Sequence, residues 1–232
     1  MADTLERAES ITRPLSILDL GLIPYEECWA LQKHLAAERA QGKIGDTLLL
    51  LEHPHTYTCG RSGGRDHILI SEADLQARGI EVLDVDRGGD VTYHGPGQLV
   101  AYPLLQLASN GRTVDYRAYL RSLEQVLIDT LCNFAIGSRR YHGYSGVWVG
   151  QEGAEEKIAA VGVKVDGRGV STHGVALNVN TDLRYFSYIV PCGISEKGVT
   201  SMQRLIGEPV DIGRVKEAFA RSFCDVFGFY RD

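Results

Sequence analysis

The chain of 232 residues lacks several features that would assign it to a class at once. It has no Cys-x-x-Cys pair, and its five cysteines are an odd number, which argues against a disulfide framework and a zinc knuckle. No apolar run is as long as a membrane span, and a net charge of −6 provides no basic footprint for nucleic acid. Met1–Ser10 carries three acidic residues and no hydrophobic core, unlike a signal peptide or a transit peptide. We therefore expect a cytoplasmic protein with reduced thiols, no membrane contact and no nucleic-acid partner.

Glycine is the residue type in excess. The chain has 26 glycines, about 11% of its residues, against roughly 7% in average proteins, and they follow no collagen period. The hydrophobic content of 44% and the charged content of 23% are ordinary for a globular protein. We predict a loose N-terminal tail over residues 1–14 and a single domain over residues 15–232 with many turns and close backbone contacts.

Hydrophobic periodicity predicts strands interspersed with four helices. The expected helices are Pro24–Arg39, Ser71–Arg78, Val114–Ile136 and Asp211–Phe227. The expected strands are Ser16–Leu20, Leu48–Leu51, Ile80–Val85, Val91–Tyr93, Leu99–Leu107, Gly146–Val149, Ile158–Val165 and Val175–Val179. No repeat or linker divides them, so the predicted fold is α/β (α+β), with one large mixed sheet flanked by helices.

The stretch Arg87–Leu99 is the most informative part of the chain. It places four glycines, a proline, one histidine and one arginine in thirteen residues, with the strand-forming Val91–Tyr93 between two turns. Tight turns of a β-rich scaffold would explain this composition. Glycine also lets the backbone approach a ligand closely, because it has no Cβ. From the residues alone, both interpretations remain open.

The cysteines differ in their surroundings. Cys28, Cys132 and Cys224 fall in predicted helices among apolar neighbours, where we expect small core residues. Cys59 falls in a flexible glycine-rich loop near arginine and remains a candidate for reactivity. Cys192 lies between a proline and a glycine at the end of an apolar strand, a context that suits either a turn or a nucleophile.

Two lysines and four small residues belong to the predicted sheet. Lys157 and Lys164 are seven residues apart, so on a regular strand they face opposite sides, and we expect Lys164 to be an ordinary solvated lysine. The small residues are either the walls of a narrow apolar tunnel or close-packed sheet positions. They are Ala160, Gly162, Gly174 and Ala176.

A metal site is the weaker interpretation of one histidine-rich stretch. His53, His55, Cys59 and His67 match no standard zinc spacing, and His-Pro-His after a strand more often ends it. We expect no metal ion.

Four sequence blocks resemble one enzyme family. RGGDVTYHGPGQLVAYPLL, from Arg87, looks like the signature block of the lipoyl(octanoyl) transferases. Lys157–Gly162 (KIAAVG), Ser171–Asn180 (STHGVALNVN) and the Pro-Cys-Gly around Cys192 also match that family, in the same order. The resemblance extends from about Leu48 to Ser201.

The resemblance implies a fold shared with biotin and lipoate protein ligases. It implies transfer of an octanoyl group from acyl carrier protein to a lysine of a lipoyl domain, without a cofactor. The acceptors in such systems are the lipoyl domains of 2-oxoacid dehydrogenase complexes and the glycine cleavage H protein. Cys192 would carry the acyl group as a thioester, with Lys157 as its acid–base partner. The residues implied to line the acyl pocket are Arg87, Gly88, Gly89, Asp90, Val91, Thr92, Tyr93, His94, Ala160, Val161, Gly162, Gly174, Val175 and Ala176.

Two positions depart from the family pattern. Val175 stands where a larger apolar residue is usual, which leaves the acyl length open, and Cys59 stands where the family generally has no thiol. An acidic carrier also requires a local basic patch, for which Arg61, Arg65, Arg139 and Arg140 are candidates. The alternatives are an ATP-dependent lipoate or biotin protein ligase and a non-catalytic lipoyl-binding protein.

Overall fold

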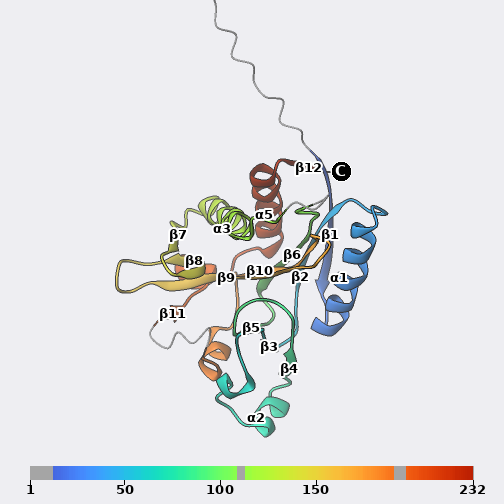
Figure 1. The fold of residues 1–232 in the computed structure, drawn as a ribbon. Coiled ribbons are helices and arrows are strands. Elements are labelled where there is room, and N and C mark those ends of the chain that lie inside the picture. The colour runs from blue at the N-terminus through green and yellow to red at the C-terminus, as the bar shows by residue number, and fades with distance from the viewer. Residues whose placement is uncertain (1–12, 109–112, 191–196, 232) are drawn as a thin grey trace, which may run out of the picture.

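A computed structural model of the chain describes residues 13–108, 113–190 and 197–231. Within these residues a large sheet runs across the molecule in the order β12-β1-β2-β6-β10-β9-β8-β7, and β11 pairs with β9 (Figure 1). It is mixed, because β1 is parallel to β2 and β12 whereas β2, β6, β10, β9 and β8 are successively antiparallel. The bounds of its strands are β1 Arg13–Leu22, β2 Asp46–Glu52, β6 Gln98–Leu104, β7 Arg139–Tyr141, β8 Tyr144–Val149, β9 Glu156–Val165, β10 Ser171–Asn178, β11 Gly198–Val199 and β12 Phe229–Arg231.

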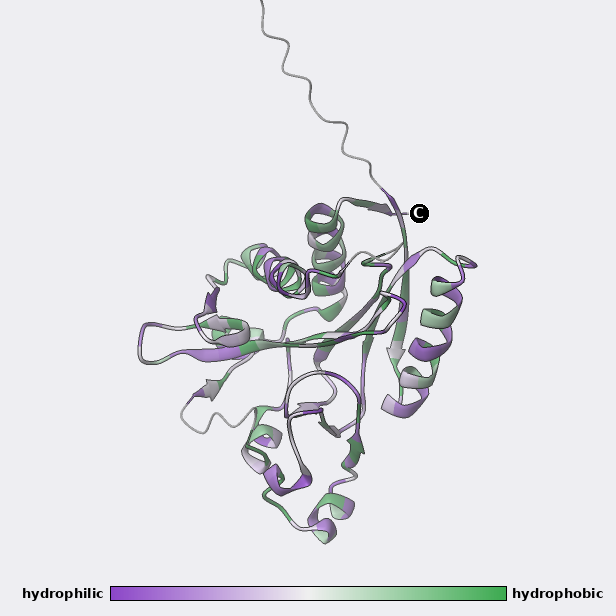
Figure 2. Ribbon diagram, viewed as in Figure 1, coloured by the Kyte–Doolittle hydropathy of each residue, from purple (hydrophilic) through white to green (hydrophobic). Residues whose placement is uncertain are grey.

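Helices cover the sheet on both sides. In Figure 1, α3 (Tyr116–Cys132) and α5 (Ile212–Phe227) lie together on one side, and α1 (Tyr25–Ala40) lies on the other. Hydrophilic and hydrophobic residues alternate along α3 and α5 in Figure 2, as expected of helices with one buried face. We call the side of the sheet under α3 and α5 the core face, and the side toward α1 the site face.

The strands divide their side chains between the two faces, because successive residues of a strand point in opposite directions. On β10, Val175 and Leu177 join the core-face cluster that α3 and α5 complete. Ala176 lies between them in sequence and joins the cluster beneath α1. The central β2 is buried on both faces, which explains its uninterrupted Leu48–Leu51 run.

A second, three-stranded sheet lies beside the site face. Its order is β4 (Glu81–Asp84), β3 (Thr56–Cys59) and β5 (Val91–His94), and short helices and 3₁₀ turns surround it: η1 (Arg65–His67), α2 (Glu72–Ala77) and η2 (Leu183–Tyr188). It has its own apolar cluster around Tyr57 and Tyr93. This second sheet adds to the large mixed sheet that was expected. The expectation that Cys59 lies in a flexible loop is wrong. The loop assignment failed because Thr56–Cys59 pairs with strands on both sides.

Local signals account for the remaining boundaries. Ser71 caps α2 by accepting a hydrogen bond from the Asp74 N–H at 3.1 Å, as its sequence predicted. α3 is shorter than expected because Asp115 caps it at Ala118. β1 begins at Arg13, inside the predicted tail, and the rest of that tail lies outside the described residues. A last short helix, α4, covers Met202–Ile206.

A helix that crosses a bilayer must be both long and apolar. In the described ranges, none combines the two properties that would let it cross a membrane.

Candidate active site

A cavity lies between the site face and the glycine-rich segment. Its volume is about 60 Å³. We call it the main cavity. Its walls are Tyr25, Arg87, Gly88, Gly89, Thr92, His94, Tyr102, Ser145, Ala160, Val161, Gly162, His173, Gly174, Val175 and Ala176.

Pairs of small residues form the floor of the main cavity. Gly162 of β9 lies opposite Gly174 of β10, and Ala160 lies opposite Ala176. A Cβ on Gly162 would point at the segment above, 3.2 Å from the Gly88 carbonyl oxygen and 3.3 Å from Arg87 Cδ. A Cβ on Gly174 would instead overlap the carbonyl oxygen of Ala101 on the neighbouring strand. Gly162 therefore lets the covering segment lie close to the floor, whereas Gly174 is required by close packing of β10 against β6.

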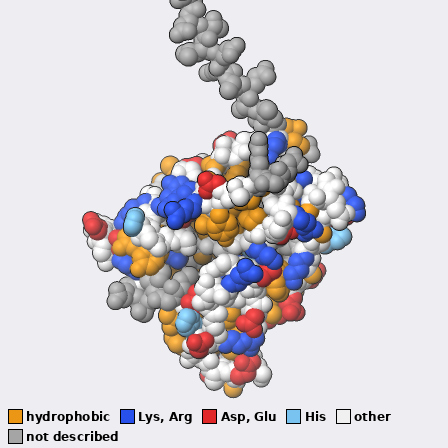
Figure 3. Space-filling model, viewed as in Figure 1, with side chains coloured by type: hydrophobic (Ala, Val, Ile, Leu, Met, Phe, Trp, Pro, Cys, Tyr) orange, Lys and Arg blue, Asp and Glu red, His pale blue; other side chains and the backbone are white. Residues whose placement is uncertain are grey.

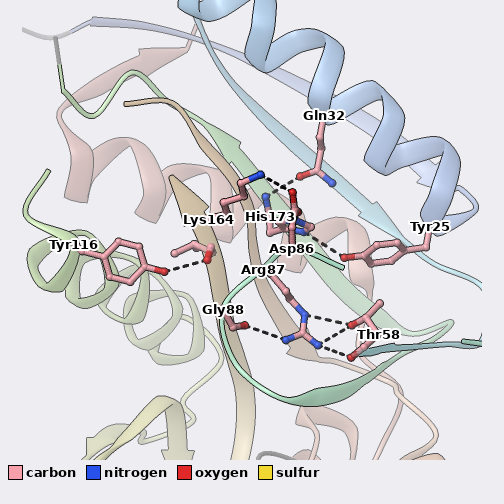
Figure 4. Close-up of polar contacts among 10 residues, drawn as sticks. Tyr25, Gln32, Thr58, Asp86, Arg87, Gly88, Tyr116, Lys164 and His173 are labelled. Carbon is pink, nitrogen blue, oxygen red and sulfur yellow. Dashed lines mark hydrogen bonds and ion pairs between the residues drawn. The ribbon is translucent and has the colours of Figure 1, made fainter. Parts of the chain in front are cut away.

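Arg87 fixes the segment that covers the cavity. Its guanidinium donates to the Thr58 carbonyl at 2.6 Å, to the Thr58 hydroxyl at 2.8 Å and to the Gly88 carbonyl at 3.0 Å (Figure 4). The backbone N–H of Gly88 donates to Val163 of β9 at 3.1 Å, and the Tyr116 hydroxyl donates to the same carbonyl at 3.0 Å. The small sheet, β9 and α3 thus hold the segment 86–89, which we call the cover, over the floor of the cavity.

Asp86 links this cover to two strands of the floor. Its carboxylate lies 2.5 Å from Lys164 Nζ on β9 and 2.8 Å from His173 Nε2 on β10, and Figure 4 shows the two side chains converging on it. Burial raises the pKa of Asp86, but the hydrogen bonds and charges of these partners outweigh it and bring the pKa to about 2. The expectation that Lys164 is simply solvated is wrong, because Lys164 is one half of this ion pair.

His173 has an uncommon backbone conformation for a residue with a side chain. Its φ is 56°, in the left-handed region. The Gln32 side chain accepts a hydrogen bond from its N–H at 2.8 Å, and Tyr25 OH lies 3.3 Å from its Nδ1 (Figure 4). Burial lowers the pKa of His173 despite the opposing influence of Asp86. A strained residue held by three polar side chains, two of them from α1, is typical of a functional site.

A buried wall of aromatic and histidine side chains closes the cavity near α1. His53 bonds the Ile23 carbonyl at 2.8 Å and the Tyr102 hydroxyl at 2.9 Å, and burial lowers its pKa to about 4. His94 donates from Nδ1 to Gln98 at 2.8 Å, and burial lowers its pKa well below the usual value. Both imidazoles are therefore neutral near pH 7. Tyr25, Tyr102 and His173 were not predicted as cavity residues, since they lie far apart in sequence.

An adjoining cavity contains Lys157. Its volume is about 30 Å³, and it shares Thr92, Ala160 and Ala176 with the main cavity. Gln98 and Asn178, also in its wall, hydrogen-bond each other at 3.0 Å, and Asn178 donates to Thr200 at 3.0 Å. A polar network thus connects the glycine-rich segment, β10 and the chain after β11.

Lys157 does not face away from Lys164, as a regular strand would require. Val147 pairs with Ala159 but Trp148 pairs with Lys157, so β9 has one extra residue, Ile158, relative to β8. Ile158 and Ala159 both join the core-face cluster, although they are consecutive. This β-bulge turns Lys157 onto the site face, the side on which Lys164 also lies.

The nucleophile predicted from sequence, Cys192, lies outside the described residues. The chain that follows it lies beside Lys157, because Val199 of β11 pairs with Lys157 and the Thr200 N–H donates to the Lys157 carbonyl at 3.0 Å. On the preceding side, the Val190 N–H donates to His67 at 2.9 Å.

Most of the predicted pocket residues line the main cavity, but three do not. Asp90 accepts hydrogen bonds from His67 and from the Val91 N–H, at 2.8 and 2.6 Å. Val91 and Tyr93 belong to the apolar cluster of the small sheet. Val175 reaches the cavity wall while its side chain belongs to the core-face cluster. Asp90, Val91 and Tyr93 thus support the cover from behind.

The other cysteines do not resemble a nucleophile. Cys28 and Cys224 are buried, as predicted, and burial raises the pKa of Cys28 to about 12. Cys59 is buried on β3, where desolvation raises its pKa, so a flexible reactive loop is excluded. Cys132 was expected in the core but is exposed at the end of α3, so that prediction is wrong.

The histidine-rich stretch is used for structure. His53, His55 and His67 each bond a carbonyl, hydroxyl or carboxylate of this chain. Among the residues that the structure describes, no three side chains capable of metal ligation converge.

The comparisons with known proteins agree with this fold. The chain belongs to the lipoyl protein ligase A/B catalytic domain family, whose pattern matches residues 24–224. Within it, the chain is 47% identical to an octanoyltransferase of Chloroflexus aggregans, over 93% of this chain and 96% of the relative. It is 49% identical to an octanoyltransferase of Solibacter usitatus, over 94% of each chain.

Solved structures show the same architecture at low sequence identity. A bi-partite lipoate protein ligase from Thermoplasma acidophilum superposes with a TM-score of 0.72 and 17% identity, covering 95% of this chain and 85% of that one. A biotin protein ligase from Aquifex aeolicus superposes with a TM-score of 0.52 and 14% identity, over 91% and 69%. The predicted fold class, an α/β domain with a large mixed sheet like that of these ligases, is confirmed.

Proposed function

We propose that this chain is an octanoyltransferase of protein lipoylation that works through a thioester on Cys192, with Lys157 as acid and base. The donor is octanoyl-acyl carrier protein, and the acceptors are lysines of lipoyl domains in 2-oxoacid dehydrogenase complexes and the glycine cleavage H protein. The relatives named octanoyltransferase support the reaction. The observation that carries the site assignment is the main cavity, which shares its wall with the cavity that contains Lys157.

The main cavity suits an acyl chain more than a polar cofactor. Gly162, Ala160 and Ala176 provide an apolar floor, and burial keeps the His94 imidazole of the wall neutral. The Arg87 guanidinium also lines the cavity, where it donates hydrogen bonds to Thr58 and to the Gly88 carbonyl. Burying most of an eight-carbon chain contributes on the order of 5 kcal/mol, at about 0.8 kcal/mol for each methylene.

The chemistry proceeds as two acyl transfers. The Cys192 thiolate attacks the donor thioester, the carbon–sulfur bond to the carrier breaks, and the departing thiolate takes a proton from the Lys157 ammonium. The acceptor amine then attacks the new thioester and gives a proton to neutral Lys157. The carbon–sulfur bond to Cys192 breaks, and the Cys192 thiolate is released. Because the first step exchanges one thioester for another and the second forms a stable amide, no nucleotide is required.

An acidic carrier protein needs a basic surface on this acidic chain. Three of the predicted docking arginines already pair with carboxylates of this chain: Arg65 with Asp84, Arg139 with Glu155 and Arg140 with Glu124. Figure 3 shows lysine and arginine side chains gathered over α3, which makes this region a docking candidate alongside Arg61.

Intact-protein mass spectrometry after mixing with octanoyl-carrier protein tests the proposal. We expect an octanoyl adduct on the wild type and on Cys28→Ala, and none on Cys192→Ala. An adduct that maps to Cys59 would contradict the assignment. A strict requirement for ATP and free octanoate would favour the ligase alternative, and binding of lipoyl domains without any transfer would favour the non-catalytic one.

A further inference from the structure

Trp148 lies directly beneath the proposed acid–base lysine. It is paired with Lys157 across β8 and β9, and its indole ring centroid is 4.8 Å from Lys157 Nζ. Trp148 is only 1% exposed, so water is excluded from the indole ring, whereas Lys157 is partly exposed. A cation within about 6 Å of an aromatic face is attracted by the ring, and more strongly where water is excluded.

The contact exists because of the bulge at Ile158. With regular pairing, Lys157 would point to the core face with Ala159, away from the main cavity. The extra residue places Lys157 and Trp148 together on the site face. Tyr141 and Tyr144 pack against the indole, with ring centroids 5.5 and 5.9 Å away, and hold it in one orientation.

The choice of tryptophan has a cost that packing alone does not explain. Its Nε1–H is buried and has no hydrogen-bond acceptor among the described residues. Burying an unpaired donor is unfavourable, and phenylalanine could occupy an apolar site without this penalty. What tryptophan provides beyond phenylalanine is the strongest cation–π surface of the aromatic side chains.

We propose that Trp148 is the positioning residue of Lys157. Its ring holds the Lys157 ammonium in the adjoining cavity, and it stabilises the protonated form that delivers the proton to the departing thiolate. The proposal rests on the proposed function, in which Lys157 is the acid of the first acyl transfer. Trp148 itself touches neither substrate nor reacting atom in this assignment.

The test measures kcat and KM against pH for Trp148→Leu and Trp148→Phe with octanoyl-carrier protein. We expect Trp148→Leu to lower kcat about tenfold, the effect of losing a desolvated cation–π contact, with KM for the donor nearly unchanged. The limb of the pH profile that reports Lys157 should move to lower pH, because its ammonium loses a favourable partner. Trp148→Phe retains an aromatic face and should recover most of the rate and of the limb position. A purely structural role would not move that limb.

Two controls isolate the contact. Phe229→Leu removes a similar pair at the opposite edge of the sheet, where the Arg13 guanidinium lies 4.7 Å from the ring, and should leave the pH profile unchanged. In a Lys157→Met background, Trp148→Leu should lower kcat no further.

An unshifted limb in folded Trp148→Leu, or full additivity of the effects of Trp148→Leu and Lys157→Met on kcat, would overturn the proposal. Full activity of Lys157→Met would instead overturn the proposed function, so the two failures are distinguishable. If Trp148→Leu does not fold, the limb in Trp148→Phe, expected to shift in the same direction by less, decides the outcome.

Discussion

On the core face of the large sheet, β9 and β10 present Val163 and Leu177 to α3 and α5, whereas on the site face the same strands present Gly162 and Ala176 to a cavity. The core face buries mainly aliphatic and aromatic side chains that need only fill space. The site face buries titratable groups, among them Arg87 and His94, each of which needs polar partners. One pair of strands thus serves two purposes, stability on one side and chemistry on the other, and changes on the two faces should have separable effects.

The sharpest separation is expected for Lys157. Lys157→Ala should lower the transfer rate by at least about 10²-fold, the low end for a general acid–base group, with little change in unfolding free energy because the side chain lies at a cavity edge. Single-turnover transfer and urea unfolding, measured on the same preparation, check both parts. A rate within a few-fold of the wild type would remove Lys157 from the mechanism.

Leu127 tests the opposite face. It is fully buried in α3 against the core face, so Leu127→Ala should lower the unfolding free energy by about 2–5 kcal/mol. The kcat of the folded fraction should remain that of the wild type, since no cavity residue is touched. A large loss of kcat in folded protein would show that the two faces are coupled.

Periodicity predicted much of this layout, because it reports which side of an element is buried. The predicted helix Asp211–Phe227 nearly coincides with α5, and Leu48–Leu51 lies within β2. The bulge at Ile158 could not be predicted, since it is one irregular residue in a strand whose apolar pattern is otherwise continuous. It reversed the predicted orientation of Lys157 relative to Lys164.

The family blocks located most of the cavity but not its polar supports. The partner of Lys164 is Asp86, 78 residues earlier, and no local pattern joins them. Likewise, Tyr25 on α1 and Tyr102 on β6 enter the cavity wall only through tertiary packing. A separate sheet around β3 was unexpected because Thr56–Cys59 is short and is followed by glycine-rich sequence. Such long-range contacts depend on the fold rather than on neighbouring residues.

Two glycines on facing strands test the shape of the floor. Gly162→Ala places its methyl group against Gly88 and Arg87, which line the same cavity, and we expect this to narrow the space for the acyl chain. Each displaced methylene costs about 0.8 kcal/mol, so octanoyl transfer should fall roughly fourfold for one and fifteenfold for two, with butanoyl transfer retained. Rates for the two donors, with thermal melts, check this.

Gly174→Ala is the matched control for Gly162→Ala. Its methyl group would overlap the Ala101 carbonyl, so the loss should appear as a lower melting temperature rather than as altered chain-length preference. Equal loss of both donors in folded Gly162→Ala would mean that Gly162 does not face the acyl chain.

The smallest expected effect concerns the ion pair that ties the cover to the floor. Lys164→Ala removes one partner of Asp86, but His173 still holds the other carboxylate oxygen at 2.8 Å. Because Lys164 and Asp86 are each about one-third exposed, their ion pair contributes little more to stability than a surface ion pair. We expect the transfer rate to fall about twofold to fivefold.

The pKa of Asp86 is held below its ordinary value of 3.8, so the stabilisation by this ion pair is complete above that pH and is lost as pH falls toward 2. The difference in unfolding free energy between wild type and Lys164→Ala should therefore shrink below about pH 4. Lys216→Ala, which breaks a 2.7 Å pair with Asp19 remote from the cavity, should leave transfer unchanged. If both lysine variants transfer at the wild-type rate, Asp86 and His173 hold the cover without Lys164. The ion pair on the site face would then have no role in the chemistry.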